Sequence, residues 1–129
     1  MNFAAQDGKT VVFVPREFLS WILREFESVI PRLSALRVEF DYSISSSDAV
    51  AWARALREGL ARRAAELEQR TRLPRSPGEG DASQDALARR IVRARFLERD
   101  AIYRALWEVA ELCEYAAANG ETVEYTEYV

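Results

Sequence analysis

The longest regular pattern in the sequence, at residues 84–118, constrains the fold most. Apolar side chains recur there at three- and four-residue spacing, as on one face of a helix. At 1.5 Å per residue such a helix would span about 50 Å, which is too long for a small domain unless the helix bends or projects. The polar residues 98–100 are the expected break, with Asp100 as a new N-cap, and Gly120 is the expected end of the helix.

The N-terminal residues carry the signals of a hairpin. Asp7-Gly8 is a favoured two-residue loop, so residues 2–6 and 9–14 are predicted to pair as antiparallel strands. Both faces of the second strand are apolar. This composition predicts a place inside the sheet, or under a helix on one side.

Two further segments alternate in the manner of strands. Residues 37–44 give the cleanest alternation in the chain, and residues 121–129 alternate well enough for a last strand. The first of these segments predicts a strand with one wet face. Its core-facing side chains are expected to be Val38, Phe40, Tyr42 and Ile44.

Two more helices complete the expected order. The first covers about residues 15–30, and the second runs from about 48 to 71 behind the hydroxyl and carboxylate oxygens of residues 45–48. The prolines and glycines of residues 73–83 predict a flexible connector. The order ββαβααβ predicts an α+β fold, with an N-terminal β-hairpin in a mostly antiparallel sheet of about four strands and three main helices packed on one face. Residues 1–129 are expected to form a single domain.

The supply of reactive side chains limits the chemistry. The sequence contains no histidine and a single cysteine, Cys113. Histidine is the usual general base near neutral pH and the commonest metal ligand, so Ser-His-Asp and Cys-His nucleophiles and imidazole-bound zinc are excluded. Cys113 lies on the apolar stripe of the last helix, where its thiol is expected to be a core group with a raised pKa. We therefore expect no enzymatic activity, no catalytic residues, no metal site and no cofactor.

Targeting signals are also missing from the sequence. No apolar run approaches the roughly 18 residues of a membrane span, and the first residues lack the basic and apolar regions of a signal peptide. A single cysteine cannot form an internal disulfide. We therefore expect a cytoplasmic protein with no membrane partner.

The charges are polarised along the chain, although the net charge is only −3. Residues 54–75 carry seven arginines and three acidic residues, and residues 89–104 carry six and two, so that each stretch has a net charge of +4. Residues 105–129 hold six glutamates and no basic residue. Such polarity bears on partners and on association rates.

The acidic C-terminal part is the candidate partner-binding surface. Three of its glutamates recur at three-residue spacing near the end of a helix, where negative charge opposes the helix dipole and needs compensation. Pairing with Arg104 or with arginines of the second helix would supply it, and a surface for a basic partner or a carboxylate-only metal site are the alternatives. Trp107 is a further anchor if it is exposed. The candidate residues are Glu108, Glu111, Glu114, Glu121, Glu124, Tyr125 and Glu127.

An arginine-rich helical stretch is the alternative site. Arg89, Arg90 and Arg93 could present guanidinium groups to the phosphates of a nucleic acid. The acidic total, the interspersed glutamates and the lack of a helix-turn-helix or RNA-binding motif favour an ion-paired, solvated face instead. Nucleic acid is therefore not the expected partner.

The general build resembles that of small bacterial immunity or inhibitor proteins. The resemblance rests on the short hairpin, the helix with Trp52 behind Ser45-Ser46-Ser47-Asp48, and the acidic C-terminal strand, and it implies action by occupying a surface of a toxin or effector. The first hypothesis is therefore a non-enzymatic protein-binding module, an inhibitor or adaptor that acts on a basic partner protein. The second is a nucleic-acid-associated accessory subunit. The third is a self-assembling structural protein, a homodimer through the third helix.

Overall fold

The structure, a computed structural model, describes residues 1–71 and 84–127, without the side chains of residues 70, 71, 84–86 and 89. The connector predicted at residues 73–83 therefore lies outside the described residues. The elements, in chain order, are β1 (Asn2–Ala5), β2 (Val11–Phe13), the 3-10 helix η1 (Arg16–Phe18), α1 (Leu19–Phe26), α2 (Ala35–Val38), β3 (Asp41–Ile44), α3 (Ser46–Thr71), α4 (Gln84–Arg99), α5 (Ala101–Asn119) and β4 (Val123–Thr126).

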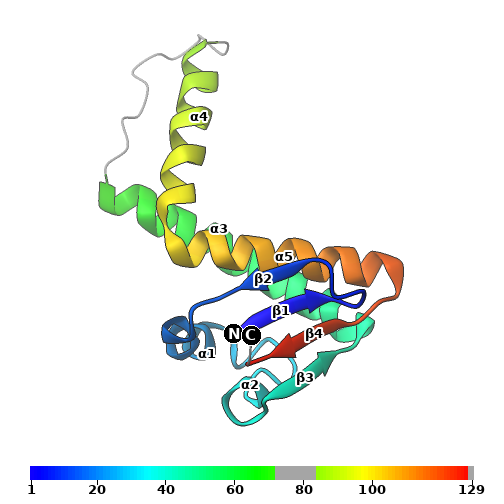
Figure 1. Cartoon of the computed structure of the whole chain (residues 1–129). Coiled ribbons are helices and arrows are strands. Elements are labelled where there is room, and N and C mark those ends of the chain that lie inside the picture. Colours follow the sequence, from blue (N-terminus) through cyan, green and yellow to red (C-terminus); the bar gives the residue numbers. More distant parts are fainter. Residues whose placement is uncertain (72–83, 128–129) are drawn as a thin grey trace.

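The four strands form one antiparallel sheet in the order β2-β1-β4-β3. Helices α3 and α5 pack along each other, and α5 also contacts β1, β2 and β4, so the two helices cover one face of the sheet (Figure 1). The predicted α+β fold with a four-stranded sheet is confirmed. Strand β4 lies between β1 and β3, so β1 from the N-terminal part and β4 from the C-terminal part pair in the centre of the sheet.

One row of side chains across the sheet faces the helices and forms the centre of the core. Phe3 on β1 lies opposite Val12 and Tyr125, and Tyr125 lies opposite Tyr42. The ring of Phe3 is 5.3 Å from that of Tyr125 and 6.0 Å from that of Trp52 on α3, measured between centroids. Tyr125 is 1% exposed. The expectation that Tyr125 provides a surface contact for a partner was therefore wrong, because its strand turns the ring into the core beside Phe3.

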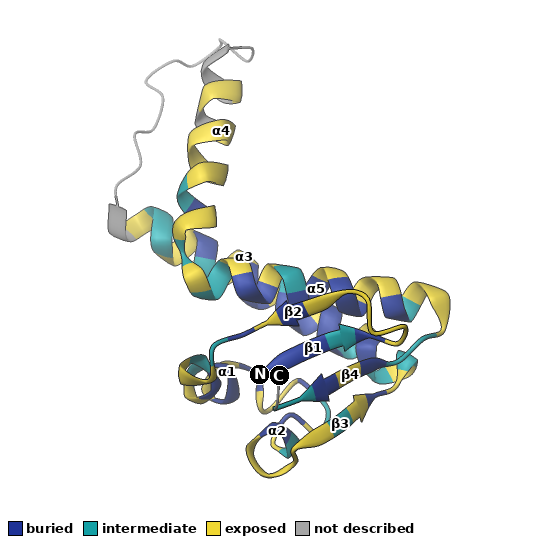
Figure 2. Cartoon of the chain, viewed as in Figure 1, coloured by how far each residue is buried: buried dark blue, intermediate teal, exposed yellow. Residues whose placement is uncertain are grey.

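Strand β2 is an edge of the sheet in the described part of the chain. Val12 and Val14 face the core, whereas Val11 and Phe13 are 55% and 59% exposed on the other face. Only β1 pairs with β2, so a place inside the sheet was wrong, whereas the predicted alternative, a place under a helix on one side, is confirmed by the contact of β2 with α5. Figure 2 shows the resulting pattern, with burial concentrated in the central strands β1 and β4. An apolar edge strand is thus left beside solvent.

The segment predicted as a strand at residues 37–44 begins as a helix. Glu39 N donates to Ala35 O at 2.8 Å, so turn hydrogen bonds continue through α2 and the extended strand begins only at Asp41. Val38 and Phe40 are consequently exposed, and the expectation that they face the core was wrong. Tyr42 is half-buried and Ile44 is fully buried, as expected.

The long C-terminal helical pattern breaks where the sequence predicted. The carboxylate of Asp100 accepts a hydrogen bond from Tyr103 N at 2.8 Å and caps α5, and α5 ends at Gly120, which adopts a φ of 65°. Helix α5 packs on α3, whereas α4 projects from the body of the molecule (Figure 1). The bend at Asp100 therefore divides the long helical pattern into two helices, of which only α5 packs along the body of the domain.

Candidate functional site

Two of the candidate glutamates are held by one arginine. Arg57 on α3 donates from Nη2 to Glu111 Oε1 at 2.6 Å and from Nε to Glu114 Oε1 at 3.1 Å. The hydrogen bond with Glu114 raises the pKa of Arg57 against the opposing effect of burial. The compensation expected from an arginine of the second helix is confirmed. One guanidinium faces two carboxylates, so the cluster keeps a net negative charge.

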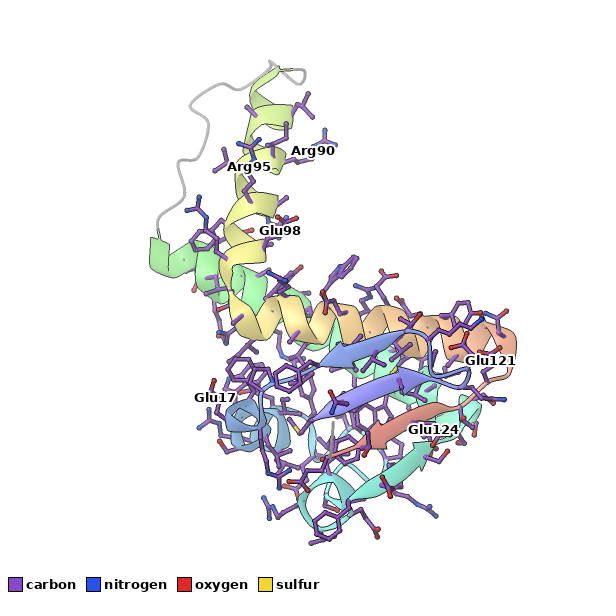
Figure 3. All side chains as sticks on the ribbon, in the orientation of Figure 1. Glu17, Arg90, Arg95, Glu98, Glu121 and Glu124 are labelled. Atoms are coloured by element: carbon purple, nitrogen blue, oxygen red, sulfur yellow. The ribbon has the colours of Figure 1, made fainter. Side chains whose placement is uncertain are left out.

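The remaining glutamates lie in different surroundings. Glu124 is on the open face of the sheet, where its Oε1 accepts from Ser43 Oγ at 2.8 Å and from Thr122 Oγ1 at 2.7 Å. Glu127 forms an ion pair with Arg16 at 2.9 Å. Figure 3 shows Glu121 at the turn between α5 and β4 and Glu124 on the sheet. The structure thus distributes the acidic residues instead of gathering them on one patch.

A groove of about 460 Å³ lies between β2 and α5. Residues of the hairpin loop, of the edge strand β2 and of α5 line this groove. Glu108 and Glu111 are the candidate glutamates that line it. The lining residues, which define the β2–α5 groove, are Ala5, Asp7, Thr10, Val11, Val12, Trp107, Glu108, Glu111, Leu112 and Tyr115.

Aromatic side chains form the helical wall of the β2–α5 groove. Trp107 and Tyr115 are 44% and 54% exposed. They stand two turns apart on α5 with Glu111 between them, because residues four apart share one face of a helix. The guanidinium carbon of Arg57 lies 5.5 Å from the centroid of the Trp107 ring, within the range of a cation–π contact. Arg57 therefore positions Trp107 as well as Glu111.

All charged lining residues of the β2–α5 groove are acidic. They are Asp7 from the hairpin loop and Glu108 and Glu111 from α5. The carboxylate of Asp7 is fixed by a hydrogen bond from Lys9 N at 2.9 Å. A concave surface with low-dielectric walls and charges of one sign focuses the field and raises the local concentration of counter-charged groups. The β2–α5 groove is therefore suited to a cationic ligand.

The arginine-rich alternative lies on the projecting helix α4. Arg90 and Arg95 point into solvent there (Figure 3), whereas Arg93 forms an ion pair with Glu68 on α3. The side chain of Arg89 lies outside the described residues. Only part of the predicted arginine surface is thus open. Among its described side chains, the same helix also exposes three large apolar ones, Leu87, Ile91 and Val92.

The remaining candidate group, the thiol of Cys113, is fully buried on α5. Burial raises the pKa of Cys113 to about 12. The expectation of a core thiol is confirmed. The described residues contain no group of three or more Cys, Asp or Glu side chains that could hold a metal ion. Among the described helices, none combines the length and apolarity needed to cross a membrane.

Sequence reasoning missed most of the β2–α5 groove. Asp7, Val11 and Tyr115 were not among the candidate residues, and Trp107 was named only as an anchor dependent on exposure. The available signal was on the helix, where Trp107, Glu111 and Tyr115 recur every four residues and so share a face. Nothing in the sequence indicated that β2 would form the other wall of the groove, because the edge position of β2 depends on pairing with distant residues.

Comparison of the chain with protein-family models, with curated proteins and with solved structures gives no significant match. The function of the protein is therefore inferred from its own surface.

Proposed function

We propose that this protein is a non-enzymatic binding module that recognises a basic partner protein through the β2–α5 groove. The observation that carries the proposal is the lining of this groove, which combines exposed aromatic side chains with carboxylates as its only charged groups among the described residues. Such a lining offers apolar area and one sign of charge at the same place. Binding would cover a surface of the partner, as an inhibitor, immunity-like protein or adaptor does.

The apolar part of the β2–α5 groove supports the proposal through binding energy. Trp107 and Tyr115 on α5 are both about half exposed, although each is a large apolar residue. Single exposed apolar residues are ordinary, but several around one concavity mark a binding surface. Aromatic residues carry much of the energy of interfaces once a partner removes them from water. We expect the partner to enclose these two aromatic rings.

The charged part supports the choice of a basic partner. Asp7 and Glu108 take part in no ion pair within the described residues, and Glu111 shares the guanidinium of Arg57 with Glu114. These carboxylates are therefore open to a cation. Complementary charge mainly raises the association rate and selects among partners, whereas enclosed apolar anchors slow dissociation.

The proposal is tested by affinity purification with the immobilised full chain, from extracts of the organism of origin. We expect a basic protein, identified by mass spectrometry, to be retained by the wild type. Glu108→Lys should reduce the association rate and its salt dependence, and Trp107→Ala should speed dissociation. Matched controls are Glu121→Lys, which makes the same charge change outside the groove, and Val50→Ala, which removes an exposed apolar side chain from α3. Equal effects of Glu108→Lys and Glu121→Lys would contradict the proposal.

A nucleic-acid-associated accessory subunit is the second candidate function. The observation in its favour is the exposure of Arg90 and Arg95 on the projecting α4 (Figure 3). Recovery of nucleic acid without a protein partner, with loss on Arg90→Glu, would favour this function over the first. Phosphate binding would also weaken steeply with salt.

Self-assembly through α4 is a third candidate. Leu87, Ile91 and Val92 are exposed on this helix, and a second copy could cover them. The mass of the protein in solution distinguishes this function from the other two. A dimer that dissociates on Ile91→Glu would support it.

A further inference from the structure

The backbone of β2 presents unused hydrogen-bonding groups beside the β2–α5 groove. Val14 N donates to Met1 O at 2.8 Å and Met1 N to Val14 O at 3.0 Å, while Ala5 N donates to Thr10 O at 2.9 Å. Bonded and non-bonded residues alternate along an antiparallel pair. The N–H and C=O groups of the intervening residues of β2 therefore point away from β1.

The outward-pointing residues of β2 are Val11 and Phe13. No described strand pairs with them on that side, because β2 ends the sheet order. Edge strands of β-sheets are usually protected from further pairing by charged side chains, prolines or bulges. Between Lys9 and Pro15 the strand has no such protection. The two residues thus offer two N–H and two C=O groups to another extended segment.

We infer that the partner enters the β2–α5 groove as an extended segment that pairs with β2 as a fifth, antiparallel strand and carries an arginine or lysine opposite Val12. This inference rests on the proposed function, since it takes the groove to be the site of a basic partner. Main-chain hydrogen bonds supply affinity in such strand addition, and pockets for alternate side chains supply specificity.

The position opposite Val12 selects the basic residue. Side chains of directly opposed residues point to the same face of a sheet, so the residue opposite Val12 projects toward α5. There it meets Trp107 and Tyr115, which suit the aliphatic stem of a long side chain, and Glu108, which suits its charged end. A lysine or arginine side chain can therefore contact both the aromatic rings and the carboxylate.

The neighbouring positions of the segment select apolar residues. They lie opposite Val11 and Phe13 and share the exposed face of these two side chains. β-branched residues pack well in this position. The segment that fits best therefore alternates between β-branched and basic residues.

A second copy of this chain is a poorer occupant of the same edge. Pairing of β2 with another β2 would bring Asp7, Glu108 and Glu111 of two molecules together, and like charges at an interface are unfavourable. The charge of the groove therefore favours a foreign basic segment over self-pairing. Self-pairing remains a measurable outcome of the experiment below.

The test uses the full chain and a short capped peptide in which valine and arginine alternate. Binding is measured by Trp107 fluorescence, with Trp107→Phe to assign the signal, and by hydrogen exchange at the amides of Val11 and Phe13. We expect exchange at these amides to slow on binding, and the affinity to fall with rising salt. A peptide with glutamate in place of arginine should bind at least about tenfold more weakly.

Backbone methylation of the peptide separates strand addition from simple charge attraction. Only the valines opposite Val11 and Phe13 turn their N–H groups toward β2, so N-methylation of the valines should weaken binding at least about tenfold. N-methylation of the arginines should leave it nearly unchanged. On the protein side, Val11→Pro removes an outward N–H that β1 does not use and should have the same effect as valine methylation.

The outcomes separate the two proposals. Binding that is lost in Glu108→Lys but unaffected by valine methylation would overturn strand addition and leave the basic-partner function standing. Binding unaffected by Glu108→Lys would place the cationic ligand elsewhere and overturn both. No binding of the alternating peptide, or a dimer that forms through β2 in its absence, would overturn the inference alone, because affinity purification tests the function independently.

Discussion

The guanidinium of Arg63 on α3 donates two hydrogen bonds to the carboxylate of Asp100, from Nε to Oδ2 at 2.6 Å and from Nη2 to Oδ1 at 2.9 Å. The same carboxylate caps α5 through Tyr103 N. Arg63 also lies 5.0 Å from the centroid of the Trp21 ring, measured from its guanidinium carbon. One ion pair therefore joins α1, α3 and the start of α5 at the point where α4 turns away.

Asp100→Ala is expected to lower the free energy of unfolding by about 2–4 kcal/mol. The change removes an N-cap and leaves a largely buried arginine without its carboxylate. Asp100→Asn keeps a side-chain oxygen for the cap and should cost about 1–2 kcal/mol. Urea unfolding followed by circular dichroism measures both. Equal losses in the two variants would show that the cap contributes nothing beyond the charge.

The same pair gives a pH dependence with a definite sign. Burial raises the pKa of Asp100, but the hydrogen bonds from Arg63 and from the backbone of Tyr103 outweigh it, so that the pKa lies below its ordinary value of 3.8. A depressed folded pKa stabilises the protein above the unfolded value, and this contribution is lost as the pH falls through the folded pKa. The difference in stability between wild type and Asp100→Asn should be constant above about pH 5 and shrink below about pH 4.

Substitutions around β3 should separate the helical turn from the strand. Ile44→Ala is expected to cost about 2–5 kcal/mol because Ile44 is fully buried, whereas Phe40→Ala should cost less than about 1 kcal/mol because the ring is 57% exposed. Thermal unfolding of the two variants compares them directly. A large loss at Phe40 would mean that the strand begins earlier, as the alternation of the sequence alone suggests.

The features predicted from sequence are those with local causes. The cap at Asp100 and the stop at Gly120 each depend on a few neighbouring residues, and both are present. The predicted hairpin is also present, but its two-residue loop was wrong, because the ladder closes with the hydrogen bond from Ala5 N to Thr10 O and leaves residues 6–9 as the loop. The alternation of apolar and polar residues around Phe40 was misleading. It covers only a few residues, and the hydrogen bonds of the α2 turn fix the backbone there instead. Short segments carry too few repeats to distinguish the two cases.

The features that could not be predicted depend on distant pairing. Arg57 meets Glu111 and Glu114 across 54 and 57 residues of chain, so the sequence indicated the need for compensation but not the arginine that provides it. The edge position of β2 likewise follows from the insertion of β4 between β1 and β3. The β2–α5 groove depends both on the edge position of β2 and on side-chain contacts between distant segments. It joins the hairpin to a helix about a hundred residues later, so it could not be predicted from the sequence.

Gly59→Ala is expected to destabilise the protein, although alanine normally stabilises a helix interior by about 1 kcal/mol relative to glycine. A Cβ at Gly59 on α3 would overlap the ring of Phe26, which is fully buried in α1. The crowding should cost about 1–3 kcal/mol net. Combination with Phe26→Leu should reduce the penalty of the alanine, and a double-mutant cycle in urea measures the coupling. Additive losses would show that the cost of the alanine does not arise from the ring of Phe26.

Cys113 should react with thiol reagents only when the protein unfolds. The thiol is fully buried, and burial raises its pKa from 9.0 to about 12, so both access and thiolate are lacking in the folded state. At a mildly alkaline pH we expect no labelling in native buffer, and a labelling rate in urea that follows global unfolding. A Cys113→Ala, Ala118→Cys variant provides an exposed thiol on α5 as the control and should react at once. Rapid labelling of the native wild type would place Cys113 at an opening in the α3–α5 packing and restore it as a candidate reactive group.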